Sequence, residues 1–356
     1  MLEWIVRAAL AAAVLAACGS GAPRSSGGAF YAGKTIRIIV PTGPGGTTDI
    51  TARLFAQQVR DYIPGRPAIV VENQEGGGNS VGIRNLTEHT PPDGLNLVSI
   101  PASAGLRWLL REPGHTYPLD KMPAVGSLPG GQVTMSRTDV APDLDTFIRK
   151  GGPYKMGGTA PGGQGQYAEV LLGHLMGFKT QHVFGFGSFA EVALAVERGE
   201  LPASTTGDLN YVQSWLSMVN RKVIVPLFQG GLLTEKGEVI RSPLVPDVPT
   251  AYEQYKRLFG KDPAGEDWEA YKVVLALNSA STALFMHPDT PSDRLAILRE
   301  AFSKATADQK WADDTKKSLG APQPAIDGQR TNDILKGALS PSPRTIEIFK
   351  QALAEG

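Results

Sequence analysis

The loop PTGPGGTTD, residues 41–49, contains the residue types of an anion-binding turn. It lies between an apolar run expected to form a strand, 36–40, and a segment from Ile50 whose apolar residues recur at helical spacing. A loop in that position points free backbone N–H groups, and the positive end of the helix dipole, at whatever binds there. Gly45 and Gly46 would let the backbone approach a ligand without interference from a Cβ atom. The sequence therefore predicts an anion site at this loop.

A single carboxylate suits this loop better than a phosphate chain. A Walker A loop would carry Lys and then Ser or Thr after its last Gly, but Thr47 and Thr48 follow Gly46 directly. A dinucleotide-binding loop would have a third Gly where Thr48 stands. In the alternative that stays open, Asp49 only caps the helix and the loop binds nothing.

A second loop of the same design, GGTAPGGQGQ at 157–166, lies between an expected strand at 154–157 and an expected helix that carries Tyr167. Thr159 and Gln164 add side-chain donors and acceptors to the glycine backbone, a mixture that orients small polar ligands. We expect the two loops, on two α/β units, to face each other across a cleft. A surface loop without a ligand is the alternative.

Most common catalytic motifs are missing from the sequence. It contains no HExxH motif and no cysteine other than Cys18, and its five histidines are scattered. The string GNSVG at 78–82 matches GxSxG, but it overlaps a glycine cluster at 75–80 that we interpret as architectural. A GxGxxA pattern at 185–190 follows too short an apolar run to be a dinucleotide fingerprint. We therefore expect no enzyme activity, no cofactor and no metal site, although the many carboxylates leave an acid/base pair open.

Short apolar runs alternate with amphipathic stretches along the chain, which predicts an α/β fold built on parallel strands. With 356 residues the chain is long enough for two domains, and we place the change between them at 121–131. The part beyond about residue 250 is expected to be mainly helical. Thr250 and Glu253 have the spacing of a capping box, and their helix should end at Gly260, whereas 256–279 fits no pattern well.

The charge balance excludes one class of partner. The sequence has 35 basic and 35 acidic side chains, hence no formal net charge. This balance removes the broad electrostatic attraction on which non-specific nucleic-acid binding depends, so no nucleic-acid partner is expected.

Cys18 follows an apolar run at 8–17, and the residues LAAC at 15–18 have the pattern of a bacterial lipobox. The run is too short to span a hydrocarbon core of roughly 30 Å but suits a signal peptide. We expect residues 1–18 to form a lipoprotein signal peptide, with lipidation of Cys18 as a membrane anchor, and residues 19–30 to form a flexible tether. An ordinary signal peptide with an incidental cysteine is the alternative.

Together these motifs resemble the Bug family, the TctC-like periplasmic substrate-binding proteins of tripartite tricarboxylate transporters. Members of the family pair a strand such as KTIRIIVP with a loop of the form PxxPGGxxD, here residues 34–49. A VVEN segment followed by glycines and Asn, a PDG turn and a VPT element match at 70–79, 92–94 and 247–250. The resemblance extends over roughly 31–320.

The resemblance implies a periplasmic-binding-protein (Venus flytrap) fold, with two α/β domains and a ligand cleft between them. Domain I would comprise 31–125 and 250–356, and domain II 126–249. It also implies an extracytoplasmic receptor that captures a small carboxylate for a tripartite tricarboxylate-type transporter or a sensor, without chemistry. We expect a monomer in the periplasm, lipid-anchored through Cys18, with the membrane subunits of such a transporter as partners.

Carried over by position, the resemblance nominates residues of both glycine loops as ligand contacts, together with two further cleft positions. They are Gly45, Gly46, Thr47 and Asp49, then Thr159, Ala160, Gly162 and Gly163, and finally Ser103 and Asp208. The second loop and the turn at 184–188 depart from the family pattern, so the identity of the carboxylate does not transfer. A periplasmic α/β hydrolase or transferase acting on a small carboxylated substrate, and a structural lipoprotein, stay open as alternatives.

Overall fold

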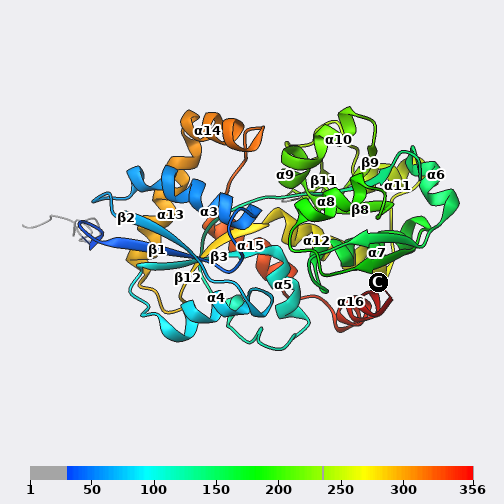
Figure 1. The fold of residues 1–356 in the computed structure, drawn as a ribbon. Helices are drawn as coiled ribbons and strands as arrows, with labels where there is room; N and C mark the ends of the chain where they lie inside the picture. Colours follow the sequence, from blue (N-terminus) through cyan, green and yellow to red (C-terminus); the bar gives the residue numbers. More distant parts are fainter. Residues whose placement is uncertain (1–29, 235, 356) are drawn as a thin grey trace, which may run out of the picture.

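The computed structural model describes residues 30–234 and 236–355, so Cys18 and the predicted lipobox lie outside the described residues. Two separate β-sheets, each covered by helices, form two lobes (Figure 1). The predicted α/β class, with two separate α/β units, is confirmed.

The six-stranded sheet of the first lobe has the order β13-β4-β12-β3-β1-β2. Its strands are β1 (Thr35–Val40), β2 (Ala68–Asn73), β3 (Asn96–Pro101), β4 (Ala124–Leu128), β12 (Thr282–Met286) and β13 (Ile326–Asp327). The five-stranded sheet of the second lobe has the order β7-β6-β8-β5-β9. Its strands are β5 (Gln132–Arg137), β6 (Tyr154–Gly157), β7 (Thr180–Val183), β8 (Ala203–Gly207) and β9 (Ile224–Gln229).

Helices follow most of these strands, and a small ribbon pairs β10 (Leu232–Leu233) with β11 (Val239–Ile240). The helices are α3 (Thr47–Val59), α4 (Ser80–Arg84), α5 (Ala102–Leu109), α6 (Leu144–Lys150), α7 (Gln164–Met176), α8 (Phe189–Glu197), α9 (Asp208–Asn210), α10 (Leu216–Asn220), α11 (Ala251–Phe259), α12 (Glu266–Ser279), α13 (Ser292–Ala307), α14 (Gln309–Leu319), α15 (Gly328–Ala338) and α16 (Pro343–Glu355).

Both sheets contain the same arrangement of three parallel strands. In the first, β1 lies between β2 and β3; in the second, β6 lies between β7 and β8. In each set the strand that comes first along the chain is the middle one. The two strands that follow it in the sequence lie on opposite sides of it, so the direction in which strands are added reverses there. In open α/β sheets such a reversal opens a crevice at the carboxyl end of the middle strand, where ligands bind. The loops after β1 and β6 are the two glycine loops.

The chain passes between the lobes more than once. It leaves β4 through 129–131 into β5, and it returns from α12 into β12. These two passages are joined, because Gly130 N donates a 3.0 Å hydrogen bond to Asn278 O at the end of α12.

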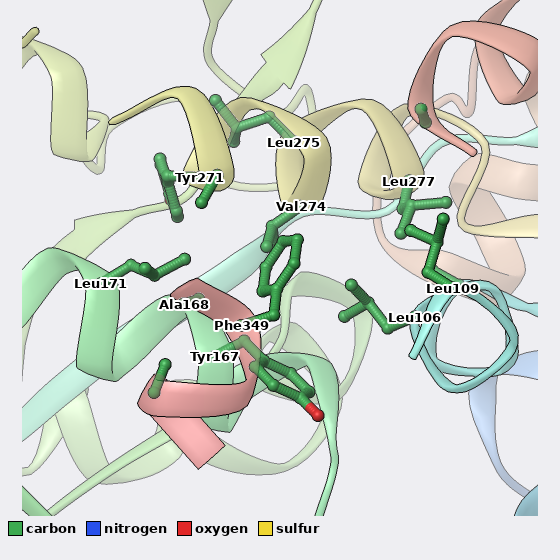
Figure 2. Packing of buried hydrophobic residues seen from close by; sticks show 14 of the residues in the cluster. Leu106, Leu109, Tyr167, Ala168, Leu171, Tyr271, Val274, Leu275, Leu277 and Phe349 are labelled. Atoms are coloured by element: carbon green, nitrogen blue, oxygen red, sulfur yellow. The ribbon is translucent and has the colours of Figure 1, made fainter. Parts of the chain in front are cut away.

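The helices α5, α7, α12 and α16 share one apolar core (Figure 2). Leu106 of α5 and Leu277 of α12 lie on one side of it, and Phe349 of α16 reaches in beside Val274 of α12. The Phe349 ring also packs edge-on against Tyr167 of α7, with ring centroids 5.5 Å apart. This core ties the helix after β3 of the first sheet to helices of the second lobe.

The predicted domain limits, 31–125 with 250–356 and 126–249, stay a prediction. All strands of the first sheet lie within 35–128 and 282–327, and those of the second within 132–229. The helices α11, α12 and α16, which belong to the predicted domain I, pack against α7 in the predicted domain II.

The C-terminal part is mainly helical, as expected, and the predicted capping box is confirmed. Thr250 Oγ1 accepts from Glu253 N, Glu253 accepts from Thr250 N, and the helix ends at Gly260 in the left-handed conformation. The segment that fitted no pattern, 256–279, forms the end of α11 (256–259) and all of α12. Because α12 is buried on several sides, its apolar residues do not follow a single stripe, which hid it from a periodicity search.

No helix within residues 30–234 and 236–355 combines the length and the apolar character that crossing a bilayer requires.

His174 of α7 pairs with carboxylates of α12 and α16, and the strength of these contacts depends on pH. Its Nδ1 lies 3.3 Å from Asp267 of α12, and its Nε2 lies 2.7 Å from Glu355 of α16. Burial lowers the pKa of His174, but the hydrogen bonds with Glu355 and Asp267 outweigh it, so the pKa is raised above its ordinary value of 6.5.

A pKa raised by folding stabilises the protein below the unfolded value, and the contribution disappears as pH rises through the folded value. We therefore expect His174→Gln to lower the melting temperature at pH 5.5 and to leave it nearly unchanged at pH 9. The loss should stay below about 1 kcal/mol, because water screens this partly exposed pair. Thermal unfolding at the two pH values, with the exposed His89→Gln as control, measures it; equal losses at both would contradict the expectation.

Candidate ligand-binding site

A cavity of about 440 Å³ lies between the two lobes, at the carboxyl ends of β1, β3, β6 and β8. Seven of the ten predicted contact residues line it, and these are Gly46, Thr47, Ser103, Thr159, Ala160, Gly163 and Asp208. The other three, Gly45, Asp49 and Gly162, lie in the same loops but do not line the cavity. The structure thus brings both glycine loops to one cavity, while contact with a ligand stays a prediction for each residue.

The two loops contain turns with matching geometry. Each begins Pro-Gly-Gly, and the first glycine has a positive φ, +82° at Gly45 and +74° at Gly162. The N–H of that glycine donates to the side chain four residues further on: Gly45 N to Asp49 Oδ2 at 3.0 Å, and Gly162 N to Gln166 Oε1 at 2.9 Å. The first glycine therefore makes the turn and uses its N–H inside the loop, which explains why neither Gly45 nor Gly162 lines the cavity.

The second glycine of each turn starts a helix without capping it. Gly46 precedes α3 and Gly163 precedes α7; both have extended backbone, and neither helix receives a hydrogen bond from a capping side chain. The first N–H groups of a helix have no intrahelical acceptor, and they carry the positive end of its dipole. Two helices of 13 residues thus present their N-termini to the same cavity. This arrangement suits an anion.

Asp49 acts inside the first loop. It is 3% exposed, and its carboxylate accepts hydrogen bonds from Gly45, Arg53 and Asn73. Burial raises the pKa of Asp49, but these hydrogen bonds outweigh it and hold the pKa below its ordinary value of 3.8. A charged Asp49 therefore fixes the shape of the turn without lining the cavity itself.

Asp208 lines the cavity and holds the segment between the lobes. Its Oδ2 accepts from Gly131 N at 2.7 Å and from Ser242 Oγ at 2.6 Å, and its Oδ1 accepts from Leu209 N at 2.8 Å. Burial raises the pKa of Asp208 to about 6, although the same hydrogen bonds favour the charged form. The hydrogen-bond donors to the Asp208 carboxylate thus all belong to the protein itself.

Arg107 was not predicted, and it connects the two lobes at the cavity. It lies one helical turn after Ser103 on α5, and its Nη2 donates to Pro161 O of the second loop at 2.5 Å. Its Nη1 lies 2.6 Å from Glu112, and its buried Nε has no acceptor among the described residues. The spacing of four from Ser103 is a sequence signal that could have found it, because residues i and i+4 share a helix face.

Aromatic and polar residues of the second lobe complete the wall. Phe184 and Phe189 line the cavity, and the Phe184 ring stacks on His182 with centroids 5.9 Å apart. His182 and Glu169 also line it and form a buried pair with each other. No sequence motif marked these residues, since they come from three different elements.

Among residues 30–234 and 236–355, no group of three or more His, Cys, Asp or Glu side chains is arranged to hold a metal ion.

Comparison with known protein sequences gives Bug and UPF0065 proteins as relatives. No protein-family model matches the chain. BugT of Bordetella pertussis is 37% identical over 92 residues, which cover 26% of this chain and only 27% of BugT. A UPF0065 protein from the ttuE–ttuC′ intergenic region of Agrobacterium vitis is 26% identical over 292 residues, covering 78% of this chain and 73% of that protein.

Solved structures share the fold along nearly the whole described chain. The periplasmic binding protein BugD superposes with a TM-score of 0.65 at 18% identity, covering 90% of this chain and 98% of BugD. The predicted resemblance to the Bug family is confirmed. The periplasmic-binding-protein fold that this resemblance implied is confirmed with it. Two other structures with this fold are MatC of Rhodopseudomonas palustris with bound malate (TM-score 0.62, 20% identity, 90% and 99% covered) and R. palustris Rpa4515 with adipate (TM-score 0.67, 16% identity, 90% and 97% covered).

Gly46 offers a direct test of the cavity between the lobes. Its φ is −79°, and an ideal Cβ there would meet only Gly43 O at 3.9 Å, so the loop has room for a side chain. We expect Gly46→Val to cost at most about 1 kcal/mol of stability and to weaken carboxylate binding by more than tenfold, because the side chain blocks the approach to the N-terminus of α3. Thermal unfolding and calorimetric titration measure the two effects.

Two further variants serve as controls for that experiment. Gly337→Val changes an exposed helical glycine far from the cavity lining and should leave affinity unchanged. Gly45→Val should instead destabilise the protein, because its φ of +82° is strained for a β-branched residue. Unchanged affinity in Gly46→Val would remove the first loop from the binding site.

Proposed function

We propose that this chain is an extracytoplasmic solute-binding receptor that captures a small carboxylate-containing ligand for a tripartite tricarboxylate-type transporter or a sensor. The observation that carries the proposal is the pair of uncapped helix N-termini, behind Gly46 and Gly163, that line one cavity between two lobes. A carboxylate held there would accept hydrogen bonds from backbone N–H groups of both lobes.

The size and the lining of the cavity support a small organic acid. A volume of about 440 Å³ lies in the range of small-molecule sites. Phe184 and Phe189 supply apolar surface for a carbon skeleton, and Arg107 supplies the cationic side chain. The fold neighbours MatC and Rpa4515 hold malate and adipate, which are acids of this class.

The enzyme alternative needs a reactive group at the ligand. His182 and Glu169 could exchange a proton in the cavity, but they are paired with each other. A receptor needs no such step, and the sequence contains no HExxH motif and no cysteine beyond Cys18. The receptor is therefore the simpler proposal.

The location and the partners are part of the same proposal. The lipobox at 15–18 and the relationship to periplasmic binding proteins support export and anchoring to the membrane through Cys18. A tethered monomer with the domain limits given above would deliver its ligand to membrane subunits of the transporter.

Carboxylates should stabilise the full chain against heat. We expect at least one of malate, adipate, citrate, glutamate and benzoate to raise the melting temperature, since a ligand at 100 times its Kd adds about 2.7 kcal/mol to stability. Dimethyl adipate and inorganic phosphate are the controls: the ester lacks the charge, and phosphate is an anion without a carbon skeleton. No shift with any acid, or an equal shift with the ester, would contradict the proposal, and turnover of an acid seen by NMR would favour the enzyme.

The anchor is tested by labelling the protein with a radioactive fatty acid during expression in bacteria. We expect label in the unmodified chain and none in Cys18→Ser, because the thiol is the acceptor of the lipid. A Ser20→Ala variant controls for changes near the cleavage point. Label that survives Cys18→Ser would refute the anchor.

A further inference from the structure

Asn278 is a polar residue of the cavity that no sequence motif marked. It lies near the end of α12, in the segment 256–279 that matched no pattern, and it is 1% exposed. It lines the cavity beside Gln164, the first residue of α7. The end of α12 thus meets the start of α7 at the ligand cavity.

The hydrogen bonds of Gln164 determine which way the Asn278 amide points. Gln164 Nε2 lies within hydrogen-bond distance of both Val274 O and a side-chain atom of Asn278. A backbone carbonyl can only accept, so the Gln164 atom must be the amide nitrogen. The Asn278 atom that faces it must then be the acceptor Oδ1. The other end of the Asn278 amide is the donor Nδ2.

Nδ2 of Asn278 is buried and finds no acceptor among the described residues. Thr206 of β8 also lines the cavity and is 1% exposed. Its hydroxyl is likewise buried and has no hydrogen-bond partner among the described residues. A buried donor without a partner costs about 1–3 kcal/mol, so native proteins rarely leave one unused. Asn278, which contacts Gln164 at the uncapped N-terminus of α7, therefore points to an acceptor supplied from outside the chain.

We propose that Asn278 is a ligand-binding residue: its Nδ2 donates a hydrogen bond to a carboxylate oxygen of the ligand at the N-terminus of α7, and Gln164 positions the amide. This assignment rests on the proposed receptor function and names one contact within it. It also gives the segment 256–279 a role, since α12 delivers the donor. Because Asn278 O accepts from Gly130 N between the lobes, the ligand contact lies at the passage between them.

Two substitutions test the hydrogen-bond donor of Asn278 separately from any effect on folding. Asn278→Asp keeps an oxygen for Gln164 but replaces the donor with a negative charge, and Asn278→Ala removes the amide while Gln164 keeps Val274 O. The matched control is Asn332→Asp, because Asn332 Nδ2 already donates to Met122 O in the first lobe. Each variant is titrated calorimetrically with malate, adipate, citrate, glutamate and benzoate, and its thermal unfolding without acid is recorded.

For any of these acids that binds the unmodified chain, we expect the Kd to rise about tenfold or more in Asn278→Ala and about a hundredfold or more in Asn278→Asp. Asn332→Asp should bind as the unmodified chain does. Affinity within twofold of the unmodified chain in both Asn278 variants, or an equal loss in Asn332→Asp, would overturn the assignment and leave the receptor function standing. If none of the acids binds the unmodified chain, the receptor function fails and the assignment fails with it.

Discussion

The first N–H groups of an α-helix have no acceptor within the helix, and this constraint organises the molecule around its cavity. A side-chain cap usually meets the need, but α3 and α7 both begin after a glycine that offers none. Both helices follow the middle strand of three parallel strands, so sheet topology brings their uncapped ends to the same crevice. The two lobes therefore present equivalent helix N-termini to one cavity, each after a Pro-Gly-Gly turn.

The absence of net charge in the sequence agrees with this way of binding an anion. Charged side chains at the cavity are matched within the protein: Arg107 pairs with Glu112, and His182 pairs with Glu169. Asp208 has three hydrogen-bond donors of its own. The attraction that remains for a ligand comes mainly from backbone dipoles and amide donors. Such groups are already oriented before binding, so their cost of ordering is small.

Much of the fold and the outline of the site could be predicted from the sequence, because short-range patterns decide them. The strand-glycine-helix order at 36–50 and at 154–167 located both loops, and the capping box at Thr250 located a helix start. Side chains that reach the cavity from elsewhere could not be predicted in this way. Arg107 and Asn278 enter it through tertiary packing, and α12 carries no amphipathic stripe because helices surround it.

Composition alone could not predict the different roles of the two glycines in each loop, since Gly45 and Gly46 are the same residue type. Backbone conformation separates them: a positive φ and an internal hydrogen bond at the first, an extended backbone and a face on the cavity at the second. The same split recurs at Gly162 and Gly163. Asp49 and Gln166 then become equivalent, since each closes its turn by accepting from the first glycine. The two turns thus reach the same geometry with different chemistry, a carboxylate paired with Arg53 in the first and a neutral amide in the second.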